Sequence, residues 1–202
     1  MEPTVDHVAV TWSSFDGLAS SYDRWYGTPL GSFVDGVERR AVLGFLRPRP
    51  GELVLDIGSG TGRLCQRLAR RGVRCVGLEP SRQMLSVAQA ARGHGNPCYI
   101  RGVAERLPLA SGVFDAVTFV TTLEFVTDVD AALVEAARVA KPGARLLLGV
   151  LNSRGPWAAW RRRSRDPLWE RARFFHAADL KRRLAQLGPV SFQSAVYVKG
   201  EF

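Results

Sequence analysis

Three glycines at alternate positions, Gly58, Gly60 and Gly62, follow a short apolar run at 53–57. Glycine has no Cβ, so it adopts positive φ and lets the backbone come close to a bound molecule. The first N–H groups of a helix that follows such a loop have no partner within that helix. The spacing therefore predicts that the loop binds a nucleoside-containing ligand. A tight turn from strand to helix without a ligand is the alternative.

The glycine spacing and two acidic residues bear on the class of nucleoside ligand. A dinucleotide-binding loop of the pattern G-x-G-x-x-G needs glycine at position 63 or 65, and the sequence has Arg63 and Cys65. Asp56 ends the apolar run, where its carboxylate suits an ammonium group better than a pyrophosphate. Glu79 ends the next apolar run, where an acid accepts hydrogen bonds from ribose hydroxyls. NAD enzymes share an acid at that place, so Glu79 alone does not discriminate.

Five ordered stretches resemble the class I S-adenosylmethionine-dependent methyltransferases, and within them the type 11 family: 55–63, 77–85, 101–109, 114–125 and 138–148. The resemblance implies methyl transfer from S-adenosylmethionine to a small-molecule acceptor. Residues implied to bind the cofactor are Tyr22, Asp56, Gly58, Ser59, Gly60, Gly62, Glu79, Pro80, Met84, Ala104, Glu105 and Thr121. Trp25 is a further candidate to close over the cofactor, and packing of an N-terminal helix is the alternative for Tyr22 and Trp25.

The catalytic residues are not identified by the sequence. Methyl transfer is an in-line displacement in which the enzyme chiefly holds two reactants in position, so no nucleophilic side chain is required. Segment 121–124 and the segment after 152 are expected to face the acceptor. Many relatives have histidine where this chain has Glu124 or Phe125, so the role of that histidine does not carry over. Glu124 and His176, which begins a predicted helix, are weak candidates for a substrate-side base. Helix capping is the alternative role of His176.

The elements that must position these residues alternate between strand and helix patterns. Expected strands are 53–57, 73–78, 98–101, 114–120, 144–151 and 190–198, and expected helices are 30–46, 63–71, 81–91, 129–140 and 177–187. This order predicts an α/β fold with a Rossmann-like, doubly wound and mostly parallel sheet, which binds ligands beyond the carboxyl ends of its strands. The family sheet has seven strands; this sequence suggests that the last one is absent or is supplied in another way.

A chain of 202 residues suits a single methyltransferase domain. We divide it into an N-terminal helical cap at 1–50, a cofactor-binding core at 51–151, a basic lid rich in Trp and Arg at 152–176, and a final helix and strand at 177–202.

The net charge of +9 is concentrated in one segment. Residues 154–183 contain ten of the Lys and Arg residues and only three acids. Three interpretations are open: a solvated lid, a site for an anionic acceptor, and a peripheral membrane contact through 156–173 that would suit a lipid-like or quinone acceptor. Nucleic acid is the least favoured partner, and the sequence does not determine the oligomeric state.

Cys65, Cys75 and Cys98 show no metal-ligand spacing, so no metal is expected. Reduced cysteines, an N-terminus without signal-peptide features and the lack of a long apolar run favour a cytoplasmic protein. Two alternatives to the methyltransferase remain open. One is a non-catalytic protein that binds S-adenosylmethionine, and the other, less favoured, is an NAD-linked oxidoreductase.

Overall fold

The computed structural model describes residues 15–194 except 92, 94, 96, 164–168, 170 and 171, and only the backbone of 156, 157, 161 and 162. The helices and strands on which the description depends are α2 (Ala19–Tyr26), α3 (Pro29–Leu46), β1 (Leu53–Ile57), α4 (Arg63–Ala69), β2 (Arg74–Glu79), α5 (Arg82–Ala90), β3 (Cys98–Arg101), β4 (Phe114–Val120), the 3-10 helix η1 (Leu123–Phe125), α6 (Val129–Val139), β5 (Ala140–Gly149), α7 (Pro156–Arg163) and α9 (Ala177–Leu184).

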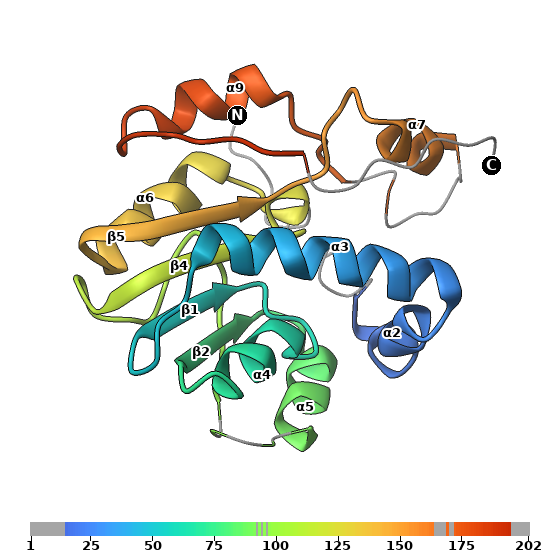
Figure 1. The fold of residues 1–202 in the computed structure, drawn as a ribbon, viewed down its shortest axis with the longest axis horizontal. Helices are drawn as coiled ribbons and strands as arrows, with labels where there is room; N and C mark the ends of the chain where they lie inside the picture. Colours follow the sequence, from blue (N-terminus) through green and yellow to red (C-terminus); the bar gives the residue numbers. More distant parts are fainter. Residues whose placement is uncertain are drawn as a thin grey trace, which may run out of the picture.

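A five-stranded sheet in the order β3-β2-β1-β4-β5 forms the centre of the fold, and every neighbouring pair of strands is parallel (Figure 1). Strands β1 and β4 lie inside the sheet and are almost continuously buried, which explains their unbroken apolar sequences. The predicted α/β, Rossmann-like fold is thereby confirmed. All the strands point the same way, so their carboxyl ends share one edge of the sheet.

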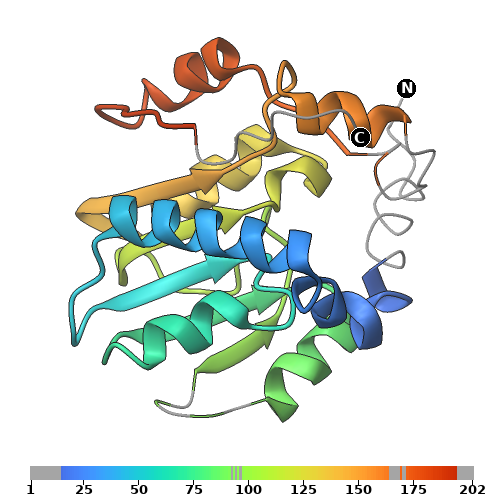
Figure 2. The same cartoon turned by 45° about the vertical axis from the view of Figure 1, so that its right-hand side comes forward.

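Helices cover both faces of this sheet, as Figures 1 and 2 show. On one face, α3, α4 and α5 pack through a buried cluster that includes Leu46, Leu68 and Ala88. On the other, α6 and α9 pack through a larger cluster that includes Leu133 and Leu180. Helix α2 covers neither face of the sheet and lies beyond the carboxyl ends of the strands (Figure 1).

Strand β5 begins earlier than expected, because it includes the Lys-Pro-Gly segment at 141–143 that was predicted to separate helix from strand. Phe114 pairs with Ala140 and Ala116 pairs with Arg145, so the register shifts between these two pairs. A bulge of this kind accommodates Pro142, which has no N–H to donate, and Gly143, whose φ is 76°. Helix α6 accordingly ends at Val139, directly before the strand.

The prediction of a strand at 190–198 is wrong for residues 190–194, which are in no strand. Residues 195–198 lie outside the described part of the chain. Pro189 cannot donate a ladder hydrogen bond, and Phe192 stays 47% exposed, so this segment gains neither a strand partner nor a buried face. Within the described residues, β5 is therefore the last strand of the sheet.

Replacing Gly62 with alanine should destabilise the fold by about 1–3 kcal/mol. Gly62 precedes α4 with a φ of 80°, and an added Cβ would lie 2.2 Å from the Tyr99 hydroxyl oxygen. Gly44→Ala is the control, because Gly44 lies inside α3 and a Cβ added there would have nothing within 4 Å. That change should be neutral or stabilise by about 0.5–1 kcal/mol. Thermal and urea unfolding measure both; equal effects of the two variants would contradict the reasoning.

Candidate cofactor site

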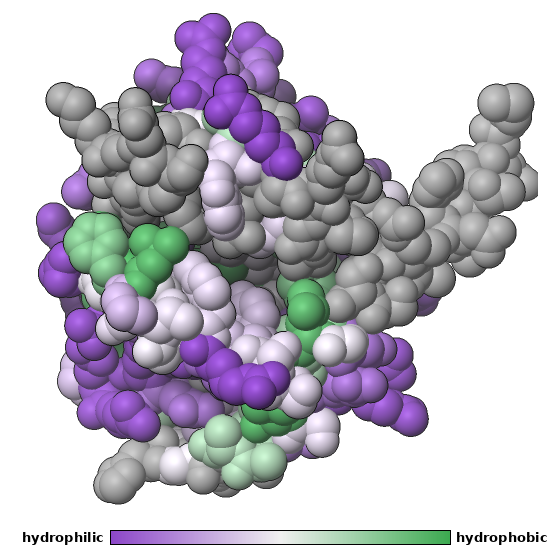
Figure 3. Space-filling model, turned by 90° about the vertical axis from the view of Figure 1, so that its right-hand side faces the viewer, coloured by the Kyte–Doolittle hydropathy of each residue, from purple (hydrophilic) through white to green (hydrophobic). Residues whose placement is uncertain are grey.

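A cavity of about 160 Å³ opens at the carboxyl ends of β1, β2 and β4. Its walls come from the glycine loop, the turns after β2 and β4, and helices α2 and α3. Figure 3 views the molecule from this side, where hydrophobic and hydrophilic residues are interspersed. A ligand that fits here must have both polar and apolar parts.

Eleven of the twelve residues predicted to bind a cofactor line this cavity: Tyr22, Asp56, Gly58, Ser59, Gly60, Glu79, Pro80, Met84, Ala104, Glu105 and Thr121. Gly62 is not among the lining residues, and its lack of a side chain serves packing against Tyr99 instead. Trp25 does not line the cavity either; its ring packs edge-on against Tyr26, with the centroids 4.9 Å apart.

Glu79 joins the glycine loop to the turn that follows β2. Its Oε2 accepts a hydrogen bond from the backbone N–H of Gly60 at 2.9 Å, and its Oε1 accepts one from the N–H of Ser81, also at 2.9 Å. Burial raises the pKa of this carboxyl. A carboxylate has about four acceptor sites, so the side chain can still accept bonds from a diol in the cavity.

Asp56 lies deeper, at the end of β1, and is 3% exposed. Its Oδ1 accepts a hydrogen bond from the Thr118 hydroxyl at 2.8 Å, and the Cys65 thiol lies 3.8 Å from its Oδ2. Burial raises the pKa of Asp56 to about 7. Both carboxylate oxygens thus already have donors from the protein, although the sequence suggested that Asp56 would meet an ammonium group.

The apolar end of the cavity lies at the start of α5. Met84 and Ala104 are buried there, 1% and 6% exposed. Ser81 caps α5 by accepting the N–H of Met84 at 3.1 Å. Glu105 is held by the N–H groups of Thr127 and Asp128, at 2.9 and 3.3 Å. The Met84 and Ala104 side chains thus line the cavity with apolar atoms, which suits packing against a base.

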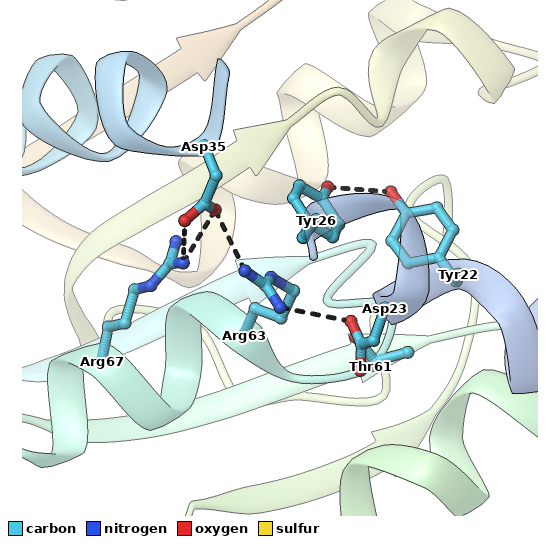
Figure 4. Close-up of polar contacts among 7 residues, drawn as sticks. All are labelled: Tyr22, Asp23, Tyr26, Asp35, Thr61, Arg63 and Arg67. Atoms are coloured by element: carbon cyan, nitrogen blue, oxygen red, sulfur yellow. Dashed lines mark hydrogen bonds and ion pairs between the residues drawn. The ribbon is translucent and has the colours of Figure 1, made fainter. Parts of the chain in front are cut away.

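An ionic cluster closes the cavity on the side of α3 (Figure 4). Arg67 makes two bonds to the carboxylate of Asp35, at 2.6 and 2.7 Å, and Arg63 makes an ion pair with the same carboxylate at 3.2 Å. The Arg63 guanidinium also lies over the ring of Tyr26, 3.9 Å from its centroid. These contacts connect α2 and α3 to α4.

Helix α2 is also bound to the glycine loop. The Thr61 hydroxyl donates to Asp23 at 3.0 Å, and the Tyr26 hydroxyl donates to that of Tyr22 at 3.4 Å (Figure 4). Burial raises the pKa of Tyr22 and of Tyr26, so both phenols are neutral near pH 7. The sequence did not single out Tyr26.

Sequence reasoning also missed residues Asp35, Glu38, Arg39 and Val42 of α3, which line the cavity. Their spacing puts them on one side of the helix. This spacing was the only sequence signal that these residues line a cavity. Charged residues on a helix, however, usually indicate a solvated face.

Thr121 has a left-handed backbone, with a φ of 52°, which is uncommon outside glycine. Its N–H donates to the carbonyl of Gly149 at 2.7 Å, which holds the turn after β4 against the end of β5. Such backbone strain is often found at functional sites. Here it occurs in a residue that lines the cavity.

Known proteins resemble this chain in sequence and in fold. Residues 55–148 match the family model of a methyltransferase domain. A demethylmenaquinone methyltransferase of Mycobacterium marinum is 43% identical over 137 residues, which are 67% of this chain and 57% of that protein. An uncharacterised protein of Mycobacterium tuberculosis is 38% identical over 177 residues, 84% of this chain and 58% of that protein. A solved structure of an S-adenosylmethionine-dependent methyltransferase from Thermotoga maritima is 28% identical, has a TM-score of 0.67, and aligns over 87% of this chain and 79% of that one.

Residues 55–148 thus resemble a methyltransferase domain. The sheet order and the solved structure agree with a class I methyltransferase fold, and S-adenosylmethionine is the cofactor that the family implies. The chain spans 57–58% of the length of the two curated relatives named above.

The site fits that cofactor on observations of its own. Ser59 Oγ and Arg63 Nε are buried and have no hydrogen-bond partner in the described structure, and both residues line the cavity. A Cβ added to Gly60 would meet nothing within 4 Å, so the loop leaves open space above it. Orphaned polar atoms beside open space indicate a polar ligand.

The two candidates for a substrate-side base do not line this cavity. Glu124 is 2% exposed, and its Oε1 accepts the N–H of Leu151 at 2.6 Å. His176 is the N-cap of α9, where its Nδ1 accepts the N–H of Ala178 at 3.3 Å. In this structure Glu124 connects η1 to the segment after β5, and His176 caps α9; their catalytic role stays a prediction.

The segment 152–176, which the sequence predicts to be a basic lid, is described only in part. Its helix α7 contains the buried Ala158 and the exposed Arg163, whereas residues 164–168, 170 and 171 lie outside the described residues. Trp169 packs near Phe125, with the ring centroids 5.8 Å apart, and Phe125 lines the cavity. The segment therefore reaches the rim of the site.

In the described part of the chain, no helix is both long and apolar enough to cross a membrane. Nor do the residues that the structure describes include a group of three or more His, Cys, Asp or Glu side chains suited to a metal ion.

Replacing Glu124 with glutamine should help stability more at pH 8 than at pH 5. Burial raises the pKa of Glu124 to about 7, so ionisation weakens the folded state as the pH rises from the unfolded pKa of 4.5 through 7. Glutamine does not ionise, and one pKa unit corresponds to about 1.4 kcal/mol, so a relative gain of about 1–3 kcal/mol is expected. Thermal unfolding of both proteins at the two pH values measures it.

Glu135→Gln is the control, because hydrogen bonds from Arg138 lower the pKa of Glu135 to about 2. Its effect on stability should be the same at pH 5 and pH 8. A Glu124→Gln effect that is equally independent of pH would show that Glu124 is not neutralised by burial.

Proposed function

We propose that this chain binds S-adenosylmethionine in the cavity and transfers its methyl group to a small-molecule acceptor. The observation that carries the proposal is the pair of hydrogen bonds that Glu79 accepts from the N–H groups of Gly60 and Ser81, which fix its carboxylate beside an open glycine loop. The resemblance of residues 55–148 to a methyltransferase domain supports it. The cofactor, when bound, supplies an electrophilic methyl group on a sulfonium.

Each part of the cavity has a role in this proposal. Glu79 accepts bonds from the ribose hydroxyls, and Met84 and Ala104 pack against the adenine. The ionic cluster and α2 close the cavity against water, so that the two reactants are held in position; this effect can contribute about 7–11 kcal/mol to catalysis. In this proposal residues 1–50 form the cap, residues 51–151 the cofactor-binding core, residues 152–176 the lid, and residues 177–202 the final segment.

For the acceptor, we propose a hydrophobic aromatic compound of the quinol type. Phe15, Tyr22 and Phe125 line the cavity, and the rings of Phe15 and Phe125 meet edge to face with centroids 4.8 Å apart. The name of the Mycobacterium marinum relative supports a quinone-related acceptor. A lipid-like acceptor of this kind would be dissolved in a membrane. The arginines of the lid would then contact the anionic headgroups of that membrane from the cytoplasmic side.

Binding of S-adenosylhomocysteine, measured by titration calorimetry, tests the cofactor. We expect saturable binding to the wild-type protein and none of NAD at the same concentration. Glu79→Ala should weaken binding by about 10–100-fold, because hydrogen bonds to a charged group contribute about 1.5–3 kcal/mol. Asp179→Ala, an exposed acid on α9, is the control and should bind normally. NAD binding without a response to S-adenosylhomocysteine would refute the proposal.

Methyl transfer to a naphthoquinol with a short isoprenoid tail tests the acceptor. Radiolabelled S-adenosylmethionine should transfer its methyl group to this compound and not to a matched naphthoquinol whose acceptor carbon is already methylated. A Phe125→Ala variant should raise the KM for the quinol, because it removes an aromatic wall, with little change in the affinity for S-adenosylhomocysteine. Cofactor binding without transfer to any quinol would instead favour a non-catalytic binding protein or another acceptor class.

A further inference from the structure

Five carboxylates line the cavity, and four of them are already bonded to the protein. Asp35 pairs with Arg63 and Arg67. The other three, Asp56, Glu79 and Glu105, accept the hydrogen bonds described above. The fifth is Glu38. Among the described residues it has no hydrogen bond and no ion pair.

Glu38 lies one turn after Asp35 on α3, on the side of the helix that lines the cavity. Burial raises its pKa to about 7; the Asp35 carboxylate raises it further, and Arg67 lowers it. Tyr22 and Tyr26 of α2 and Glu124 of η1 are the other titratable groups that interact with Glu38. A carboxylate held in a partly dehydrated cavity without a cation is unfavourable, so this position suits a ligand that brings a positive charge.

The position of Glu38 in the cavity indicates which positively charged group of the ligand it would contact. Met84 and Ala104 form the wall for the base near α5, whereas Glu38 projects from α3, with α4 between these two helices (Figure 1). S-adenosylmethionine has its only ammonium group at the amino-acid end, away from the adenine. Asp56, the other acid near that end, already has protein donors on both oxygens.

We propose that Glu38 binds the α-ammonium group of S-adenosylmethionine. This inference rests on the proposed function, and it assigns to a residue of α3 the recognition that the sequence suggested for Asp56. The bond forms only with ligands that carry the amine, so Glu38 distinguishes the intact cofactor from adenosine thioethers that lack the amino-acid end.

Titration calorimetry with three ligands tests this assignment. S-adenosylhomocysteine has the amine and the carboxylate, its decarboxylated analogue keeps only the amine, and 5′-methylthioadenosine has neither. Glu38→Gln should weaken binding of the first two by about 10-fold or more, as expected for a hydrogen bond to a charged group. It should change the affinity for 5′-methylthioadenosine by less than about twofold.

Arg40→Gln is the matched control, because Arg40 is an exposed residue of the same helix and does not line the cavity. It should leave all three affinities unchanged. Thermal unfolding without ligand checks the fold of Glu38→Gln, whose midpoint should equal or exceed that of the wild type, since the substitution removes an unpaired carboxylate.

Two outcomes would overturn the assignment. An equal loss of affinity for all three ligands would mean that Glu38 only supports the shape of the cavity. Unchanged affinities together with a slower methyl transfer would mean that Glu38 acts on the acceptor. Wild-type protein that binds none of the three ligands would contradict the proposed function itself, and so the two failures are distinguishable.

Discussion

The carboxylate of Glu79 fixes the geometry on which the rest of the site depends. Strands β1 and β2 are adjacent and parallel, with Ile57 paired to Leu78, so the acid that ends β2 falls beside the loop that follows β1. The carbonyl of Leu78 accepts the N–H groups of Gly58 and Ser59, and Glu79 then accepts that of Gly60. Successive N–H groups of the loop are thus bonded to a neighbouring strand, which leaves the outer side of the loop open.

Much of this arrangement could be predicted, because it is encoded by short stretches at strand ends. Strands β1 and β4 read as buried apolar runs, and a parallel sheet brings the carboxyl ends of all its strands together. Residues at the end of a strand or directly after it, such as Glu79, Gly58 and Thr121, therefore reach one cavity although they are far apart in the chain. The local pattern was sufficient there.

The wall made by α2 and α3 could not be predicted in the same way. Asp35 and Glu38 read as ordinary charged positions on a helix. The inward orientation of Asp35 depends on Arg63 and Arg67 of α4, about 30 residues away. The left-handed backbone of Thr121 likewise depends on its bond to Gly149, a contact between separate strands. The early start of β5 depends on a bulge opposite β4. Each is a tertiary effect that overrides a local preference.

The two sides of the cavity are stabilised by different kinds of interaction, because the ionic cluster of Asp35, Arg63 and Arg67 lies on one side only. The sheet side is held by apolar packing around residues such as Leu55 and Phe119, which dissolved salt hardly affects. The helical side is attached to α4 through partly exposed ion pairs, which mobile ions screen over about 8–10 Å. Higher ionic strength therefore weakens the attachment of α3 to α4 more than the cohesion of the sheet.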